Sequence, residues 1–512
     1  MDRDFDVIII GSGAGGGTLA HALSTTGKKI LIIERGDYLP REKANWDPGA
    51  VFIENRYHTH EKWYDKDGKG FTPGMNYYVG GNTKVYGAAL LRLRKTDFEE
   101  VKHYGGTSPA WPLSYEDFQP YYLKAEELYT VHGTRGEDPT EPPESEPYYY
   151  PAVSHEPHIQ KLSDSIEQMK IKTFHLPMAI RLNEQDREKS KCIRCDTCDG
   201  FPCLVHAKSD AHIACILPAL QSGNVTLLTN AKAMRLIPND SGKIIEQVEI
   251  EKDGKKIRLK ASTFIVSCGA VNSAALMLRS KHDKHPNGLA NQNDMVGRHY
   301  MFHNNSAMIA VSTEYNPTIF QKTMAINDYY HGADDSDLPL GHIQLLGKVK
   351  KQMLAADAPV FAPGLALDYL ANHCMGWWLT SEDLPLPENR VTLNENGDIS
   401  LQYTANNLEA HERLLKKLKS ILKNLGGHTH FFPNKLYLSQ HIPLAGCAHQ
   451  AGTLRFGQDP RNSVLDLDCK AHGIDNLYVV DASFMPAVGA VNPSLTIIAN
   501  ALRVADILKS RI

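Results

Sequence analysis

The sequence predicts an α/β fold, and two separated regions of the chain carry that prediction. Near its start, an apolar run at residues 7–10 leads into a glycine-rich turn, a helix-like stretch and a second apolar run at residues 30–33. A β-rich region spans residues 225–268, and a strand-like run at residues 477–480 precedes a C-terminal helix. Strands that alternate with helices are typical of a parallel sheet covered by helices.

The first βαβ unit carries a dinucleotide-binding motif. Gly11, Gly13 and Gly16 have the G-x-G-x-x-G spacing, and Glu34 ends the second strand. The three glycines would allow a tight turn, a close backbone approach to a pyrophosphate, and close helix–sheet packing. The helix N-terminus would offer N–H donors, and the Glu34 carboxylate would accept hydrogen bonds from a ribose diol. This context predicts a bound adenine dinucleotide rather than a turn that binds nothing.

The composition is that of an ordinary soluble enzyme. At 512 residues with 42% hydrophobic residues, the chain has room for two or three domains with substantial cores. A net charge of -4 provides no basic footprint for nucleic acid or an anionic membrane surface. The acidic N-terminus enters the first strand directly, without room for a signal peptide, and no apolar stretch reaches the roughly 18 residues of a membrane span. We therefore expect a cytoplasmic protein without nucleic-acid or membrane partners.

Three segments lie between these regions. Residues 77–87 form a second glycine-rich element, where the backbone would approach a flat ring, or alternatively a turn between strands. Residues 137–147 are rich in Pro and Glu, which predicts a solvated loop. Residues 407–425 have the apolar spacing of an amphipathic helix, which we interpret as core packing rather than a partner-binding face.

The last seventy residues hold the candidate chemistry. His449 precedes a glycine-containing segment, and Asp481 ends the strand-like run. Asp481 would accept a hydrogen bond from a ribityl hydroxyl or orient a helix-terminal phosphate; the alternative is an ordinary helix cap. Asn492 stands before Pro493, so its side chain would either cap the following helix or point to a ligand. The sequence leaves these alternatives open.

Several motifs in order resemble the glucose-methanol-choline flavoprotein oxidoreductases over essentially the whole chain. They are the unit from Gly11 to Glu34 and the segments 80–83, 111–117, 296–298, 449–457 and 492–496. The resemblance implies an α/β fold with an FAD-binding, Rossmann-like domain assembled from residues 1–100, 190–300 and 440–512. A substrate-binding domain and cap with a mixed or antiparallel sheet would comprise residues 101–189 and 301–439.

The resemblance also implies a mechanism and a set of FAD-contacting residues. His449 would take the hydroxyl proton while hydride passes to flavin N5, and Asn492 would orient the hydroxyl without competing as a base. The residues expected to hold FAD are Gly11, Ser12, Gly13, Ala14, Gly15, Gly16, Glu34, Arg35, Gly81, Asn82, Thr83, Tyr86, Gly87, Ala233, Cys268, Gly269, Asp481, Ala482, Asn492, Pro493 and Ser494. Some sugar-oxidising relatives carry a histidine that binds FAD covalently near the position of Lys84. The stretch 82–86 contains none, so we expect noncovalent FAD.

Four closely spaced cysteines, Cys192, Cys195, Cys198 and Cys203, have several interpretations. An iron–sulfur cluster is possible but not favoured, because the spacing differs from the common ferredoxin pattern. A zinc site, disulfides or structural thiols would use the same residues. With a cluster, the enzyme would be a dehydrogenase that passes electrons to a carrier; without one, direct reoxidation by oxygen is easier.

The expected substrate is a sugar or glycoside, oxidised at a secondary pyranose hydroxyl as in glycoside 3-oxidation or by a pyranose oxidase-like enzyme. Sterols and simple alcohols are alternatives, and O2 or an artificial or protein acceptor would take the electrons. Residues 299–304 and 344–348 would line the pocket, or else form buried strands. Other hypotheses are a flavin subunit that docks an electron-transfer protein, a noncatalytic FAD-binding protein and a nicotinamide-dependent dehydrogenase. Intact His449 and Asn492 argue against the second, and the C-terminal motif against the third, because it has no role in binding NAD.

Overall fold

The largest sheet of the protein is built around the glycine-rich turn. The computed structural model describes residues 4–142, 146–312, 314–357, 364–425, 429–432, 442–446 and 448–512. The sheet has seven strands in the order β10-β2-β1-β13-β12-β11, with β21 beside β13. They are β1 (Phe5–Ile10), β2 (Ile30–Ile33), β10 (Val225–Leu228), β11 (Lys232–Pro238), β12 (Ile245–Lys252), β13 (Lys255–Val266) and β21 (Leu477–Val479). The predicted α/β fold is confirmed.

Strand β13 joins two kinds of pairing. Residues 261–266 pair in parallel with β1, while residues 255–260 form an antiparallel hairpin with β12. The hairpin turns at Asp253 and Gly254, whose φ angles of 51° and 70° suit the tight turn between twisted strands. The apolar runs of β1 and β2 are buried because helix α1 (Ala14–Leu23) packs against both strands. Helix α9 (Ser494–Lys509) packs against α1, and α5 (Ala270–Arg279) packs against β11.

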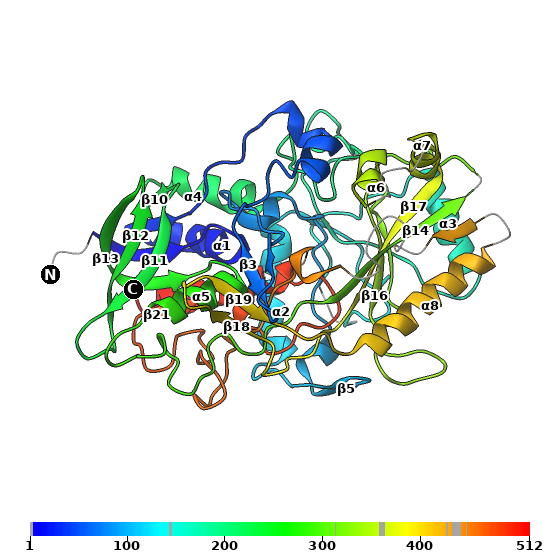
Figure 1. Ribbon diagram of the computed structural model, residues 1–512. Coiled ribbons are helices and arrows are strands. Elements are labelled where there is room, and N and C mark those ends of the chain that lie inside the picture. The colour runs from blue at the N-terminus through cyan, green and yellow to red at the C-terminus, as the bar shows by residue number, and fades with distance from the viewer. Residues whose placement is uncertain are drawn as a thin grey trace.

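A six-stranded antiparallel sheet forms the second large unit, at the opposite end of the view in Figure 1. Its order is β20-β14-β17-β16-β15-β8, with β8 (Phe174–His175), β14 (Asn304–Ser312), β15 (Met324–Ile326), β16 (His342–Leu345), β17 (Cys374–Ser381) and β20 (Thr429–Phe432). Helix α8 (Leu408–Asn424) contacts β14 and β17. Its leucines at 414, 415, 418 and 422 are buried with Trp377, which confirms the prediction that this face packs in a core.

Smaller elements complete the fold. A four-stranded sheet has the order β18-β19-β3-β4, with β3 (Trp63–Asp65), β4 (Gly70–Phe71), β18 (Arg390–Leu393) and β19 (Ile399–Gln402). Two-stranded pairs join β5 (Val101–His103) to β6 (Gly106–Ser108), and β7 (Val131–His132) to β9 (Met178–Ala179). The remaining α-helices are α2 (Tyr115–Leu128), α3 (Pro157–Glu167), α4 (Leu217–Gln221), α6 (Lys351–Asp357) and α7 (Gly364–His373). The four-stranded sheet combines chain from both predicted domains, whose boundaries stay a prediction.

The Pro- and Glu-rich segment differs from its prediction. Asp138 is buried, and its carboxylate pairs with the buried guanidinium of Arg94 at 2.6 Å. A buried arginine needs a counter-charge, so this aspartate is drawn into the interior. The prediction of a solvated loop is therefore wrong at Asp138, while residues 143–145 lie outside the described part of the chain.

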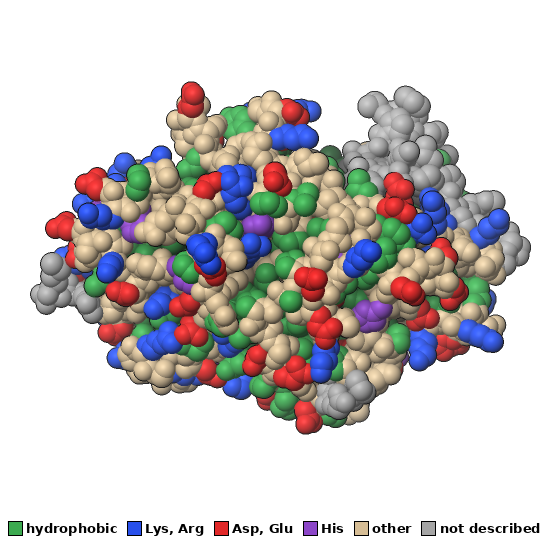
Figure 2. Space-filling view, turned by 90° about the horizontal axis from the view of Figure 1, so that it is seen from below, with side chains coloured by type: hydrophobic (Ala, Val, Ile, Leu, Met, Phe, Trp, Pro, Cys, Tyr) green, Lys and Arg blue, Asp and Glu red, His purple; other side chains and the backbone are tan. Residues whose placement is uncertain are grey.

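The surface in Figure 2 carries interspersed acidic and basic side chains. Within the described ranges, no helix combines the length and apolar character required to traverse a bilayer.

Candidate active site

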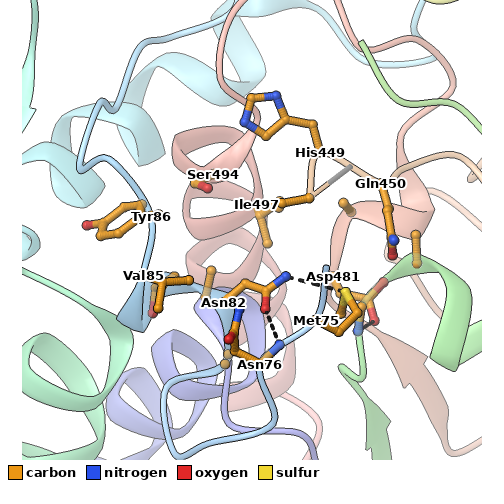
Figure 3. Close-up of a pocket in the computed structure, with 18 of the residues that line it drawn as sticks. Met75, Asn76, Asn82, Val85, Tyr86, His449, Gln450, Asp481, Ser494 and Ile497 are labelled. Atoms are coloured by element: carbon orange, nitrogen blue, oxygen red, sulfur yellow. Dashed lines mark hydrogen bonds between the residues drawn. The ribbon is translucent and has the colours of Figure 1, made fainter. Parts of the chain in front are cut away.

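One cavity of about 450 Å³ brings together most of the predicted site residues from the two ends and the middle of the chain. Those that line it are Gly11, Ser12, Gly13, Ala14, Gly15, Glu34, Arg35, Gly81, Asn82, Thr83, Tyr86, Gly87, Ala233, Cys268, Gly269, His449, Asp481, Ala482, Asn492 and Ser494. Gly16 and Pro493 are not among its lining residues. Figure 3 shows His449 on the side of Ser494 and Ile497, with Met75, Asn76 and Asn82 on the other.

The glycines of the first turn differ in what surrounds them. A Cβ at Gly11 would lie 2.1 Å from the Ser267 carbonyl oxygen, and one at Gly16 would lie 2.1 Å from the Gly11 carbonyl oxygen. Side chains there would push α1 away from the sheet. A Cβ at Gly13 would meet no protein atom within 4 Å, although Gly13 lines the cavity. The space at Gly13 is thus left for a ligand, while Gly16 acts by packing, which explains its absence from the cavity wall.

Glu34 is held at the cavity by its own hydrogen bonds. Its Oε2 accepts from the Ser12 hydroxyl at 2.6 Å and from the Ser12 N–H at 3.2 Å, and its Oε1 accepts from the Gly36 N–H at 3.0 Å. Burial raises the pKa of the carboxyl, against the lowering effect of these donors. Each carboxylate oxygen can accept more than one hydrogen bond, so acceptor capacity remains for a hydroxyl ligand.

The Asp481 carboxylate near the C-terminus caps a helix, and Asp481 also lines the cavity. The Asp481 Oδ1 accepts from the Ser483 N–H at 3.0 Å and caps a short 3-10 helix, so the capping interpretation is confirmed. Its Oδ2 accepts from the Gly269 N–H at 3.0 Å. Pro493, not Asn492, is the N-cap residue of α9, and no side chain caps that helix by a hydrogen bond. Asn492 lines the cavity.

The second glycine-rich element forms a 3-10 helix over Gly81–Lys84 at the cavity wall. The Asn82 side-chain oxygen accepts from the Asn76 N–H at 2.9 Å, as Figure 3 shows. The Lys84 ammonium forms a buried ion pair with Asp210 at 2.9 Å, and Lys84 does not line the cavity. This side chain therefore serves the protein interior rather than the ligand space.

His449 contacts a second histidine, His303, to which the sequence analysis gave no role beside the base. Its Nδ1 lies 2.9 Å from Nδ1 of His303, whose Nε2 lies 3.3 Å from the Val488 carbonyl oxygen. Burial lowers the pKa of His303 to about 4. Burial, with smaller contributions from His303 and Lys322, holds the pKa of His449 well below its ordinary value. Both imidazoles are therefore neutral near pH 7, and a neutral imidazole is able to accept a proton.

The part of the cavity beside the six-stranded sheet is polar and aromatic. Asn305 of β14, Gln344 of β16 and Trp378 of β17 line it. The Asn305 side-chain oxygen is buried without a hydrogen-bond partner. The Lys322 ammonium donates to the Asp199 carboxylate at 3.0 Å. A Cβ at Gly87 would lie 2.0 Å from that ammonium, so this glycine makes room for the ion pair.

The predicted pocket segments are partly correct. Segment 344–348 contributes Gln344 and Leu346, but residues 299–304 do not line the cavity, and the next residue, Asn305, does. Sequence reasoning missed Lys322 and Trp378 because no local motif marks them. Their positions follow from the pairing of distant strands.

Comparisons with known proteins agree with this geometry. Two sequence models of the family described as GMC oxidoreductase match residues 5–305 and 385–501. The chain belongs to the GMC oxidoreductase family. It is 30% identical to 6'''-hydroxyparomomycin C oxidase of Streptomyces lividus, over 100% of this chain and 92% of that protein. Paromamine 6'-oxidase of Streptomyces fradiae is 28% identical, over 98% and 91%.

Solved structures show the same fold at low sequence identity. Pyridoxine 4-oxidase of Mesorbium loti matches with a TM-score of 0.67 and 17% identity, over 98% of this chain and 99% of that one. Formate oxidase of Aspergillus oryzae matches with a TM-score of 0.69 and 16% identity, over 100% and 99%. The matches to the two family models confirm the resemblance to the glucose-methanol-choline family.

The cavity of this GMC oxidoreductase fits the FAD of its family. Open space at Gly13 lies at the N-terminal end of α1, where unpaired N–H groups and the helix dipole favour a diphosphate. The Glu34 carboxylate lies at the end of β2, where a ribose hydroxyl needs an acceptor. The protein is an FAD-dependent oxidoreductase that acts on CH–OH donors.

The cysteine-rich segment of this GMC oxidoreductase borders the cavity through Asp199 and Gly200. The buried Lys208 ammonium donates to the carbonyl oxygens of Cys198, Phe201 and Tyr86, which ties the segment to the cavity wall. All four cysteines of the segment are free thiols in the structure. In the part of the chain that the structure describes, no three His, Cys, Asp or Glu side chains are grouped to hold a metal ion.

Proposed function

We propose that this enzyme oxidises a hydroxyl-bearing carbon of a sugar or glycoside to a carbonyl, with His449 as the base. The observation that carries the proposal is a single cavity with the dinucleotide turn in one wall and His449 in another, beside polar and aromatic side chains of the six-stranded sheet. An alcohol is oxidised when a base takes its hydroxyl proton, because the developing alkoxide favours departure of hydride from the same carbon.

His449 and Asn492 have complementary tasks in this proposal. The neutral imidazole of His449 accepts the hydroxyl proton, and its desolvated, partly buried position lowers its pKa and keeps it unprotonated near neutral pH. The Asn492 amide lines the same cavity and orients the hydroxyl by hydrogen bonding. Bound FAD supplies the hydride acceptor.

The cofactor is proposed to bind without a covalent link. Backbone groups contact the diphosphate and the flavin ring in this proposal. They come from the first turn, the element around Asn82 and the segment from Cys268 to Gly269. Ala233 and Glu34 lie on the adenosine side. Lys84 is engaged with Asp210 instead. Predicted contacts at Arg35, Asp481, Ala482 and Ser494 stay part of this proposal. At Pro493 the proposal is weaker, because that residue does not line the cavity.

A carbohydrate substrate suits the side chains beside His449. An indole face such as that of Trp378 packs on the apolar face of a pyranose, while amides and an ion pair bind ring hydroxyls. A secondary ring hydroxyl, as in glycoside 3-oxidation, is the favoured position. Position 6 is the alternative, because it appears in the name of paromamine 6'-oxidase.

The electron acceptor and location are extensions of the proposal. Oxygen is favoured because the names of both aminoglycoside relatives describe oxidases. The fructose dehydrogenase large subunit of Gluconobacter japonicus, 24% identical, supports a separate carrier as the alternative. Free thiols suit a reducing compartment, so cytoplasm is the proposed location.

An anaerobic absorbance titration tests the proposal. Purified holoenzyme is mixed with a panel of pyranoses, methyl glycosides, amino sugars, a sterol and simple alcohols, and flavin bleaching is followed. We expect bleaching by one carbohydrate class and a carbonyl product at one carbon. Bleaching only by sterols or simple alcohols would contradict the substrate class. Admission of O2, then of a quinone, separates oxidase from dehydrogenase, and an iron assay on the same sample tests the cysteine cluster.

A further inference from the structure

The contact between His303 and His449 carries an inference that rests on the proposed function. We propose that His303 is a positioning residue that selects the tautomer of His449 and presents its Nε2 lone pair to the substrate hydroxyl. The supporting geometry is a chain of two contacts, Val488 carbonyl to His303 and His303 to His449. Neither His303 nor Val488 lines the cavity, so His303 acts only through the base.

The direction of the hydrogen bonds follows from the carbonyl at one end. A carbonyl oxygen only accepts, so the His303 Nε2 at 3.3 Å carries the proton. A neutral imidazole has one N–H, which leaves the His303 Nδ1 as a lone pair. That lone pair accepts from the His449 Nδ1–H at 2.9 Å. The remaining nitrogen of His449, Nε2, is then the unprotonated one.

The opposite arrangement is unfavourable in this environment. If His303 donated from Nδ1, its Nε2 lone pair would face the Val488 oxygen in a fully buried site. His449 would then carry its proton on Nε2 and could not act as a base there. Protonation of either ring would also break this pattern, but burial lowers the pKa of both groups. The charged or titratable groups around them are Lys322 near His449, and Glu382 and His342 near His303.

The proton balance needs no transfer beyond His449. The substrate O–H bond breaks, and its proton forms a bond with His449 Nε2. The resulting imidazolium keeps its Nδ1–H, which still donates to the His303 Nδ1. The hydrogen bond becomes charge-assisted and stronger, so it stabilises the protonated base as hydride leaves the carbon.

Two variants, whose new side chains are nearly isosteric with each other, test the role of His303 in the holoenzyme. In His303→Asn, the side-chain oxygen takes the place of the Nδ1 acceptor; in His303→Leu, no acceptor remains. We expect His303→Leu to lower the rate constant of flavin reduction roughly 10- to 100-fold, as for loss of one buried hydrogen bond, and His303→Asn to recover most of it. His285→Leu, which also replaces a buried histidine bonded to a backbone carbonyl, is the control and should keep the wild-type rate. Equal rates in His303→Leu and His303→Asn would overturn the proposal.

Nitrogen-15 NMR of histidine-labelled holoenzyme provides a readout that does not depend on turnover or on folding of the His303 variants. The His449 signals are assigned by their absence in His449→Gln. We expect the proton on Nδ1 and a lone-pair signal for Nε2; a proton on Nε2 would overturn the assignment. If His449→Ala instead left flavin reduction unchanged, the proposed base itself would be wrong, an outcome distinct from failure of the His303 variants.

Discussion

Individual side chains in this cavity acquire their chemistry from burial and from their partners. An exposed histidine is about half protonated at pH 6.5, which is its ordinary pKa. Burial beside His303 and Lys322 keeps His449 neutral at that pH. The same burial makes the Glu34 carboxyl dependent on Ser12 and Gly36 for hydrogen bonds. At the scale of single residues, proton transfer at His449 is therefore the property to test.

Replacement of His449 by alanine should separate catalysis from cofactor binding. Because the imidazole is the proposed base, His449→Ala should lower flavin reduction by about two to four orders of magnitude. The FAD content should stay that of the wild type, because the glycine-rich turn is unchanged. Stopped-flow absorbance measures both quantities. The exposed His60→Ala is the matched control, and near-normal reduction in His449→Ala would remove this residue from the role of base.

The pH dependence of flavin reduction should reflect the lowered pKa of His449. The base is active when neutral, which is the case above its pKa, and that pKa lies well below 6.5 because of burial and nearby Lys322 and His303. The rate constant should therefore be on its plateau at pH 6.5 and fall only in more acidic solution. A limb centred at or above pH 6.5 in the pre-steady-state rate would contradict this environment.

At the scale of elements, helix α1 and the turn before it serve both packing and binding. Gly16 lies against the backbone of Gly11, whereas Gly13 faces open cavity. Helix α2 has a different task, because its Glu126 accepts from Arg92 at two atoms, each at 2.7 Å, and from Arg135 at 2.8 Å. Substitutions in α1, in the turn before it and in α2 therefore distinguish effects on folding from effects on ligand binding.

Valine at Gly13 and at Gly16 should produce different defects. Gly13→Val places its side chain in the ligand space without touching the protein, and its φ of -71° suits any residue, so we expect folded protein without FAD. Gly16→Val meets the Gly11 carbonyl and should destabilise the fold itself. Circular dichroism and the 450-nm region of the visible spectrum, roughly where flavins absorb, separate the two. A fully yellow Gly13→Val protein would contradict the proposed diphosphate position.

Loss of the Glu126 charge should destabilise the molecule strongly. Glu126→Gln leaves the buried Arg92 guanidinium without its counter-charge, and breaking such a pair costs about 3–5 kcal/mol. Lys124→Ala, on the same helix, removes an exposed pair with Asp506 and a contact with the Tyr121 ring, and should cost less than about 1 kcal/mol. Urea-unfolding midpoints compare the variants. Equal midpoints would show that the buried pair contributes little.

On the scale of the whole molecule, the cavity proposed as the active site is lined by residues of two sheets. The seven-stranded sheet contributes the dinucleotide turn, and the six-stranded sheet contributes Asn305, Gln344 and Trp378. FAD is proposed to contact segments from the start, middle and end of the chain. Its retention is consequently a property of the assembled fold.

Unfolding should release FAD completely. Because the proposed contacts are noncovalent and Lys84 is paired with Asp210, acid precipitation of the holoenzyme should leave the flavin in the supernatant. The released fraction is measured by absorbance and identified by mass spectrometry. Flavin that remains with the precipitated chain would contradict noncovalent binding. Excess FAD should in turn raise the unfolding temperature of the native protein, since it binds only the folded state.

The sequence by itself determined the βαβ unit, the packing face of residues 407–425 and the family. These features depend on local patterns, namely apolar periodicity and glycines required by the backbone. It also singled out His449 and Asn492, because both lie in short segments that resemble motifs of the family.

Only the tertiary structure decided that Asp481 is a cap, that Asp138 is buried, and that Asn305 and Trp378 line the same cavity as His449. It alone placed His303 behind His449, at 2.9 Å between residues far apart in the chain. The physical reason is that strand pairing brings these side chains together over long sequence separations, and burial then sets their hydrogen bonds and protonation. No local pattern of residues encodes such contacts.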